Sequence, residues 1–111
     1  MERLFPADVP PDKEDRASFR LMITGKVQRV GYRKWMFEQM HLHGLSGWVR
    51  NLTDGRVEAA VHGPLSRIAH IHRQCASGPA RAAVDQVDIH PWTGSEVPAD
   101  VRILKTADPP N

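Results

Sequence analysis

The sequence predicts an α+β fold of order β-α-β-β-α-β, with one antiparallel sheet and two helices on one of its faces. Apolar side chains alternate in residues 18–27 and 56–62, which is typical of half-buried strands. Residues 31–43 instead space their apolar side chains at helical intervals. Asp54-Gly55 lies between two alternating runs and indicates a tight hairpin. Two right-handed crossovers around that hairpin give a ferredoxin-like sandwich.

Local signals support the other elements in turn. Tyr32, Met36 and Met40 form an apolar stripe on the first helix, and Gly44 is placed to end it. Pro64 is expected in the first turn of the second helix, where proline is favoured. The remaining expected elements are strands over residues 45–51, 84–90 and 101–104, and a second helix that ends at Ser77-Gly78-Pro79.

Length and composition place these elements in one domain. A chain of 111 residues can bury one modest core. Residues 18–105 are expected to form this domain, and residues 106–111 a C-terminal tail. Residues 1–17 combine prolines with dense mixed charge and show no apolar period, so a flexible N-terminal tail is expected there.

Composition also bears on location and ligands. Cys75 is the single cysteine, which rules out an internal disulfide and fits a reducing compartment. No run of about 18 apolar residues and no apolar signal core occurs, so the cytoplasm is expected and a membrane span is not. Residues after Arg16 hold twelve basic and eight acidic side chains. This balance suits small anionic ligands and only weakly suggests nucleic acid.

The stretch from Gly25 to Arg33 joins the first strand to the first helix and is the candidate anion site. A glycine-bearing turn before a helix presents unpaired backbone N–H groups and the positive end of the helix dipole. Arg33 lies in the first helical turn, where its guanidinium can hold two phosphate oxygens. Neither of the two standard phosphate-loop patterns is present. By itself, the stretch also fits a plain connection with a solvated arginine.

Asn51 is the second candidate, at the end of the predicted strand 45–51 and before the hairpin turn. In this topology its side chain could approach the loop of residues 28–33. An asparagine amide both accepts and donates hydrogen bonds, so it can hold a nucleophilic water beside a phosphate. The competing interpretation is a turn-favouring asparagine that bonds its own backbone.

Three motifs combine these residues in one pattern. They are Gly25-x-Val27-Gln28-x-Val30-Gly31-Tyr32-Arg33, Gly44-Leu45-x-Gly47-Trp48-Val49-Arg50-Asn51 and Asp54-Gly55-x-Val57-Glu58. The pattern closely resembles the acylphosphatase family over about residues 19–103. The resemblance implies the sandwich fold predicted above. It also implies hydrolysis of acyl phosphates to a carboxylate and inorganic phosphate, with no metal or cofactor.

The resemblance further implies roles for individual residues. Arg33 matches the phosphate-binding catalytic arginine, and Asn51 matches the asparagine that positions the attacking water. The set fits this reaction, because a carboxylate leaving group departs without a general acid and the phosphoryl charge needs positioning and electrostatic stabilisation. The expected ligands are a small acyl phosphate and inorganic phosphate. The phosphate cradle matches the backbone of Gln28, Arg29, Val30, Gly31 and Tyr32.

One position departs from the family's usual Val-Gln-Gly-Val loop, because this chain has Arg29 in place of the glycine. If that position has a positive φ, an arginine adds about 1–2 kcal/mol of strain or changes the turn. If φ is ordinary, Arg29 points to solvent or adds a second cation near the anion. Retained activity is the prediction, and an altered rate or affinity is the alternative.

Other residue clusters indicate no competing catalytic site. The pairs His41/His43 and His70/His72 point to different faces of their helices, so no metal site is expected. Cys75 falls on the apolar stripe of the second helix and is expected to be a packed thiol.

The alternative function is a non-catalytic anion-binding or RNA-binding module on the same fold. The basic charge and Arg29 favour it, but the strands lack an aromatic pair at the spacing that stacks bases. A regulatory or maturation role, like that of acylphosphatase-like domains within larger proteins, is a further option. A monomer is the default expectation, with no nucleic-acid partner.

Overall fold

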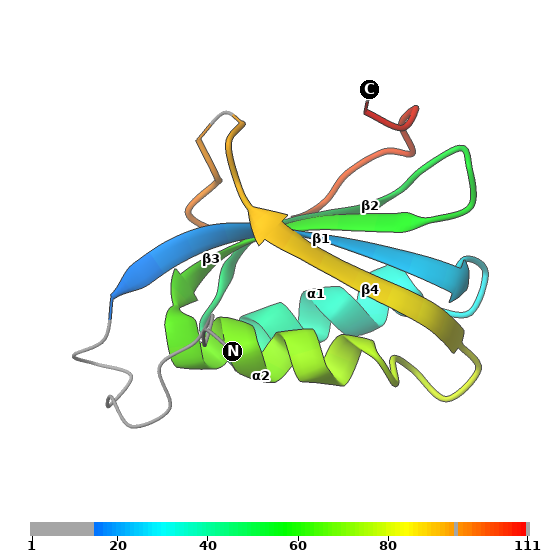
Figure 1. The fold of residues 1–111 in the computed structure, drawn as a ribbon, viewed down its shortest axis with the longest axis horizontal. Coiled ribbons are helices and arrows are strands. Elements are labelled where there is room, and N and C mark those ends of the chain that lie inside the picture. Colours follow the sequence, from blue (N-terminus) through cyan, green and yellow to red (C-terminus); the bar gives the residue numbers. More distant parts are fainter. Residues whose placement is uncertain (1–14, 95, 111) are drawn as a thin grey trace.

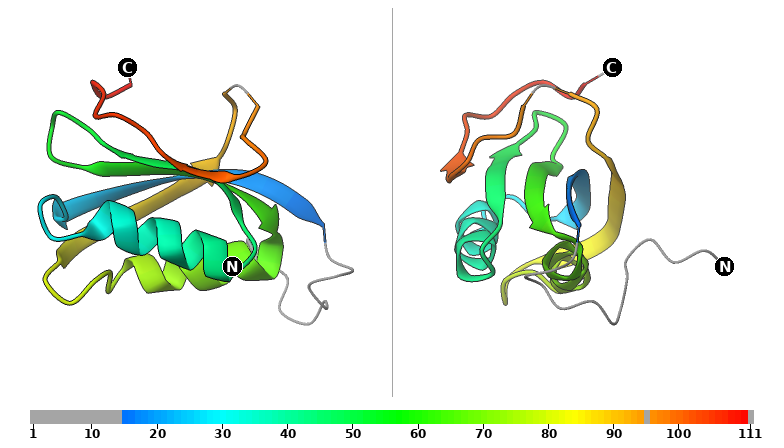
Figure 2. Two further views of the ribbon diagram at one scale, coloured as in Figure 1. Left: turned by 180° about the vertical axis from the view of Figure 1, so that it is seen from behind. Right: turned by 90° about the vertical axis from the view of Figure 1, so that its left-hand side faces the viewer.

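Two helices lie against one face of a five-stranded sheet, as the sequence predicts (Figure 1, Figure 2). The structure is a computed structural model that describes residues 15–94 and 96–110. The predicted boundaries lie within two residues of those observed. The elements are β1 (Arg16–Lys26), α1 (Tyr32–Leu42), β2 (Ser46–Asn51), β3 (Val57–Pro64), α2 (Leu65–Cys75), β4 (Ala83–Pro91) and β5 (Val101–Ile103).

The sheet has the strand order β4-β1-β3-β2-β5, with β1 and β3 at its centre. β1, β2, β3 and β4 pair in antiparallel fashion. β5 differs from the prediction of a fully antiparallel sheet, because it pairs in parallel with β2. The loop after β4 reverses the chain, so β5 runs opposite to β4. It therefore runs in the same direction as β2, and the sheet is mixed.

Two predicted element boundaries need a small correction. Pro64 lies at the N-cap of α2 rather than inside its first turn, because it still pairs with Arg16 as the last residue of β3. The same pairing makes β1 begin at Arg16, two residues before the predicted start. The expected N-terminal tail, residues 1–17, otherwise lies outside the described residues except for Asp15.

The core lies between the sheet and the helices, where the alternating side chains of the central strands meet the helical stripes. α1 ends as expected, with Gly44 in the left-handed conformation and the N–H of Leu45 donating to the carbonyl of Met40 at 2.9 Å. The fully buried side chains of this core include Leu21, Ile23, Val49, Val57, Ala59, Val61, Met36, Met40, Ile68, Ile71 and Cys75.

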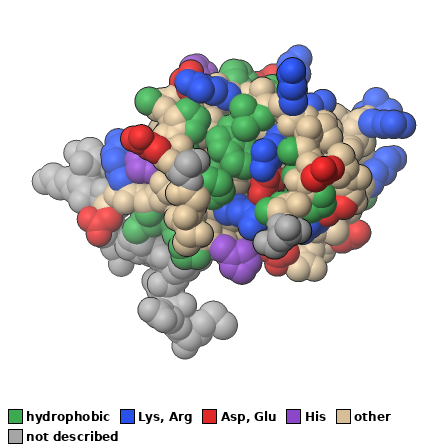
Figure 3. Space-filling view, turned by 90° about the horizontal axis from the view of Figure 1, so that it is seen from above, with side chains coloured by type: hydrophobic (Ala, Val, Ile, Leu, Met, Phe, Trp, Pro, Cys, Tyr) green, Lys and Arg blue, Asp and Glu red, His purple; other side chains and the backbone are tan. Residues whose placement is uncertain are grey.

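The opposite face of the sheet is covered by side chains instead of helices, and Figure 3 shows hydrophobic and charged groups side by side on it. Trp48 and Trp92 pack edge to face with their ring centroids 5.7 Å apart. The guanidinium of Arg50 lies 4.7 Å from the centre of the Trp48 ring. Trp48 is only 8% exposed. The two indoles therefore cover each other and do not form an open stacking platform.

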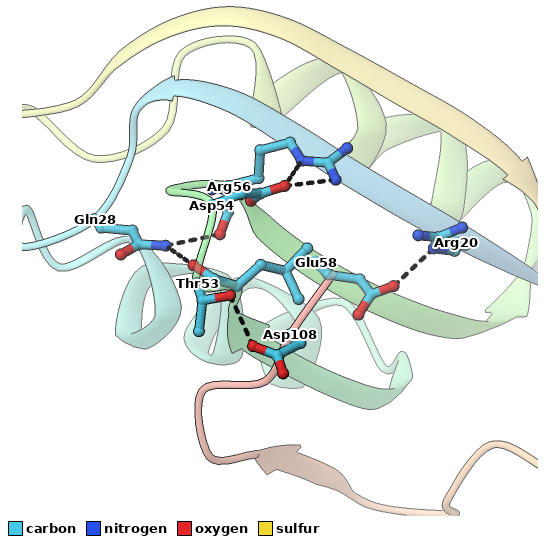
Figure 4. Close-up of polar contacts among 8 residues, drawn as sticks. Arg20, Gln28, Thr53, Asp54, Arg56, Glu58 and Asp108 are labelled. Carbon is cyan, nitrogen blue, oxygen red and sulfur yellow. Dashed lines mark hydrogen bonds and ion pairs between the residues drawn. The ribbon is translucent and has the colours of Figure 1, made fainter. Parts of the chain in front are cut away.

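The predicted C-terminal tail, residues 106–111, is docked through its described residues. The N–H of Ala107 donates to the carbonyl of Asn51 at 3.1 Å, and the N–H of Thr53 donates to the carbonyl of Ala107 at 2.9 Å. The Thr53 hydroxyl also donates to Asp108 at 3.0 Å (Figure 4). This segment therefore supports the β2–β3 hairpin from the edge of the sheet. Within the described residues, no helix is long and apolar enough to cross a membrane.

Candidate active site

The loop between β1 and α1 is held by two buried valines, Val27 and Val30, and exposes the residues next to them. Arg29 and Gly31 both have positive φ, 61° and 80° respectively. Burial of every second or third side chain fixes the path of the loop, while Arg29 and Gly31 are exposed. The loop is thus rigidly placed but open to a ligand.

The conformation of Arg29 decides between the two alternatives left open by the sequence. Its φ of 61° lies in the left-handed region, which glycine adopts freely and other residues adopt at a cost of about 1–2 kcal/mol. The turn therefore keeps the geometry that suits glycine and accommodates the arginine with strain. The Arg29 side chain is exposed and lines the pocket described below.

The start of α1 leaves several backbone donors without a helical acceptor. Its first intrahelical bond runs from the N–H of Trp35 to the carbonyl of Gly31 at 3.0 Å. No side chain caps this end, and the first turn contains no acidic residue. The N–H groups of the first turn and the helix dipole are therefore not neutralised by the chain itself, which favours a bound anion.

Gln28 ties this loop to the hairpin. Its side-chain amide donates to the carbonyls of Leu52 at 2.8 Å and Arg56 at 2.9 Å. Figure 4 shows the Gln28 side chain reaching across from the loop to the hairpin turn. Because Leu52 directly follows Asn51, these bonds set the distance between the loop and the end of β2. Gln28 thus positions the site through its side chain.

The hairpin turn is itself braced by charged side chains. Asp54 accepts bonds from the backbone N–H of Arg56 at 3.1 Å and from its Nε at 2.8 Å (Figure 4). The hydrogen bond from the Arg56 side chain, followed by the bond from its backbone, lowers the pKa of Asp54. The turn therefore keeps a charged pair at neutral pH.

One pocket of about 240 Å³ brings the loop, the helix start and the end of β2 together. Arg33, in the first turn of α1, and Asn51, at the end of β2, both line it. Gln28 and Val30 do not line it, because Gln28 bonds the hairpin and Val30 is buried. The lining residues are Val27, Arg29, Gly31, Tyr32, Arg33, Lys34, Asn51 and Ile103.

Sequence reasoning missed two of these lining side chains, Lys34 and Ile103. Lys34 follows Arg33 in the first helical turn, so its position beside the loop could have been found from that spacing. Ile103 had no such signal, because it reaches the pocket only through the parallel pairing of β5 with β2. It is 46% exposed, and among the described residues only Leu42 is a more exposed large hydrophobic side chain.

Tyr32 lines the pocket, but its hydroxyl is bonded elsewhere. Its side chain is 1% exposed, and the hydroxyl donates to the carbonyl of Cys75 at 2.8 Å. Burial raises the pKa of Tyr32 well above its usual range, so the phenol stays neutral. The residue thereby fixes the start of α1 against the end of α2.

The rival groups named from the sequence do not form a second catalytic centre. Burial raises the pKa of Cys75 to about 12, so this packed thiol, 3.7 Å from the sulfur of Met36, stays protonated. The rings of His43 and His70 contact each other at a tilt of 58°, with their centroids 4.4 Å apart. Within residues 15–94 and 96–110, no three or more His, Cys, Asp or Glu side chains gather where they could hold a metal ion.

Comparison with known proteins decides the family. The sequence pattern of the acylphosphatase family matches residues 19–103. The chain belongs to the acylphosphatase family. The acylphosphatase of Rhizorhabdus wittichii is 41% identical over 83 residues, which cover 75% of this chain and 84% of that protein.

Solved acylphosphatases share the fold. The acylphosphatase of Coxiella burnetii superimposes with a TM-score of 0.76 at 28% identity, over 85% of this chain and 97% of that chain. The acylphosphatase of Bacillus subtilis gives a TM-score of 0.74 at 26% identity, over 78% and 97%. This acylphosphatase is accordingly a hydrolase of acyl phosphates that releases inorganic phosphate.

Proposed function

We propose that this acylphosphatase binds the phosphoryl group of a small acyl phosphate between Arg33 and the free N–H groups at the start of α1. Asn51 then holds the attacking water from the other side of the pocket. The observation that carries the proposal is the shared pocket, which Arg33, Asn51 and Gly31 all line. The lack of a side-chain cap or an acidic residue in the first turn of α1 supports the same placement of the anion.

The chemistry follows from these positions. The water oxygen bonds to phosphorus while the bond from phosphorus to the acyl oxygen breaks, and the electron pair leaves with the carboxylate. The proton of the water passes to a phosphate oxygen or to solvent. Arg33 and the N–H groups stabilise the charge spread over the phosphoryl oxygens, and Asn51 orients the water in line with the leaving oxygen. Asn51 works by position, since an amide is not a base at neutral pH.

The proposal assigns no metal and no cofactor to the reaction. A carboxylate is a weak base, so it leaves without protonation or coordination, and the phosphoryl charge has enough donors in the pocket. The proposed form is a monomer without a nucleic-acid partner. The proposed location is the cytoplasm, supported by the single cysteine, Cys75, which is a free thiol.

Hydrolysis of benzoyl phosphate in the presence of EDTA tests the proposal. The wild-type chain is compared with Arg33→Ala, Asn51→Ala and Arg67→Ala. Arg67→Ala is the matched control, because it removes the same charge from α2 and does not line the pocket. Isothermal titration with inorganic phosphate gives the binding affinity of each variant.

The expected result separates the two roles. Arg33→Ala loses both phosphate affinity and most turnover, while Asn51→Ala loses turnover at least 100-fold, the order expected for a lost positioning group, and still binds phosphate. Arg67→Ala behaves as wild type. Full activity in folded Arg33→Ala and Asn51→Ala would overturn the site, and loss of all turnover with EDTA would overturn the metal-free reaction.

A further inference from the structure

We infer that Arg29, with Lys34 beside it, forms a second anion subsite in the pocket. The preferred substrates are then acyl phosphates whose acyl group carries a carboxylate of its own. This inference rests on the proposed function, because it takes Arg33 and the start of α1 as the phosphoryl site. It concerns what recognises the rest of the substrate.

The first observation is the charge of the pocket. Arg29, Arg33 and Lys34 all line it, and no acidic side chain does. Three other surface pockets in the described part of the chain each combine arginine with an acid. These are Arg102 with Glu96, Arg16 with Asp100, and Arg20 and Arg50 with Glu58. The pocket of Arg33 and Asn51 thus differs from these three in holding uncompensated positive charge.

The second observation is that these cations have no partner among residues 15–94 and 96–110. No ion pair or side-chain hydrogen bond joins Arg29, Arg33 or Lys34 to another described residue. Elsewhere in the described chain, four arginines are held by acids at 2.7–2.8 Å, namely Arg20, Arg50, Arg56 and Arg102, and the other arginines form no ion pair with a described residue. The pocket cations thus keep their donors available for a ligand.

The third observation is that Arg33 and Arg29 belong to different segments of the backbone. Arg33 projects from the helix that presents the free N–H groups, and together they suffice for one phosphoryl dianion. Arg29 projects from the preceding loop, where its left-handed backbone is strained. A strained residue of this kind is typical of functional positions. Its guanidinium remains available to a second anion once Arg33 and the N–H groups hold the phosphoryl group.

The remaining lining fits the acyl part of such a substrate. Ile103 is 46% exposed and, with Val27, provides apolar surface in the same pocket. A pocket of about 240 Å³ has room for a phosphoryl group and a short chain of methylenes. A carboxylate at the far end of the acyl chain would face Arg29 and Lys34 of the pocket lining.

A binding experiment tests the subsite without turnover. The probes are 3-phosphonopropionate and propylphosphonate, which differ only in a carboxylate that replaces a methyl group. Affinities are measured by isothermal titration for wild type, Arg29→Gln, Arg29→Lys and Lys34→Gln, with Arg67→Gln as the control. Glutamine keeps the backbone strain of position 29 and removes the positive charge. Lysine keeps the strain and the charge.

Wild type is expected to bind 3-phosphonopropionate about 3- to 10-fold more tightly than propylphosphonate, the effect of one partly solvated ion pair. This preference should vanish in Arg29→Gln, fall in Lys34→Gln, persist in Arg29→Lys and Arg67→Gln, and weaken with added salt. Equal affinities in wild type, or an unchanged preference in Arg29→Gln, would overturn the inference.

Turnover of succinyl phosphate and butyryl phosphate, a matched pair of the same kind, separates this inference from the proposed function. A higher kcat/KM for succinyl phosphate that Arg29→Gln abolishes supports both. Hydrolysis of both compounds at the same relative rate in wild type and Arg29→Gln supports the proposed function and contradicts the subsite. If wild type hydrolyses neither compound, the proposed function fails, and the phosphonate affinities still decide the subsite.

Discussion

Arg29 is the one described residue other than glycine with a positive φ, and it lies in the loop that forms the pocket. The backbone on both sides is fixed by the buried Val27 and Val30, so the loop cannot relax to an ordinary turn. The residue therefore carries local strain in a conformation set by its neighbours. We expect this strain to affect stability, whereas the role proposed for the side chain is in substrate recognition.

Arg29→Gly should raise the free energy of unfolding by about 1 kcal/mol, because glycine adopts φ near 61° without strain. The gain stays below the full strain energy, since glycine also adds freedom to the unfolded chain. Urea denaturation followed by tryptophan fluorescence measures it. Arg29→Ala is the control, because alanine has the same backbone strain as arginine. Equal stabilities of the glycine and alanine variants would show that the backbone is not strained there.

At the level of elements, the site depends on how the β1–α1 loop and the β2–β3 hairpin are joined. Gln28 makes two bonds from its side chain to backbone carbonyls of the hairpin. The C-terminal segment contacts the hairpin through Ala107 and Asp108. The position of Asn51 relative to Arg33 is therefore set by contacts that involve neither residue's side chain.

Gln28→Ala should destabilise the fold by about 1–2 kcal/mol, because two hydrogen bonds to partly buried carbonyls are lost. Turnover should fall by more than the affinity for phosphate, since the loop still offers its N–H groups but its distance from Asn51 is no longer fixed. Urea denaturation and steady-state kinetics provide the measurements. Gln74→Ala, an exposed change on α2, is the control. A Gln28→Ala variant with wild-type kcat would contradict this positioning role.

Glu58 joins strands of the sheet through its side chain, as Gln28 joins the loop to the hairpin. It is 2% exposed on central β3, and one of its oxygens accepts from Arg20 of β1 at 2.7 Å (Figure 4). Its other oxygen accepts from Arg50 of β2 at 2.8 Å. One carboxylate thus joins three strands on the face away from the helices. Because both arginines are partly exposed, the network is worth less than a fully buried one.

Glu58→Gln should lower the free energy of unfolding by about 2 kcal/mol, because two arginines then lose their only counter-charge in this network. KM for an acyl phosphate should not change, because Glu58 does not line the pocket. Chemical denaturation compares this variant with Glu38→Gln, which removes an exposed charge from α1. A loss no larger than that of Glu38→Gln would show that the network contributes little.

The elements that the sequence predicted are those with local signals. Alternation, helical spacing and Asp54-Gly55 depend on neighbouring residues, so strands, helices and hairpin follow from them. The parallel pairing of β5 and the docking of Ala107 depend on contacts far apart in sequence, which local patterns do not encode. For the same reason, Arg33 and Asn51 could be named from motifs, whereas Ile103 and the bonding of Gln28 required the fold.

At the scale of the whole molecule, the two helices meet at histidines. The ring of His43, which follows α1, contacts the ring of His70 in α2. Burial lowers the pKa of His43, with further lowering from the nearby charges of His70 and Arg67. Burial also lowers the pKa of His72, followed by the effect of Arg73. The folded state therefore favours the neutral form of both rings.

Stability should consequently fall as the pH drops below about 6.5, the pKa of histidine in the unfolded chain. The unfolded chain binds protons there first, because the folded pKa values of His43 and His72 lie lower. The stabilisation is complete above that pH and is lost as the pH falls through the folded values. The urea concentration at the midpoint of unfolding, determined between pH 8 and pH 5, measures this loss of stability. The double variant His43→Gln/His72→Gln should flatten the slope, and an unchanged slope would assign it to other groups.

The uncapped start of α1 has a consequence for folding as well as for catalysis. Its unpaired N–H groups and the cations around them favour an anion that only the folded chain can bind. Inorganic phosphate, the product, should then be a stabilising ligand that adds about 2.7 kcal/mol to the folded state at 100 times its dissociation constant. We therefore expect the empty enzyme to be the less stable form, and the phosphate level of its surroundings to shift its folding equilibrium as well as its turnover.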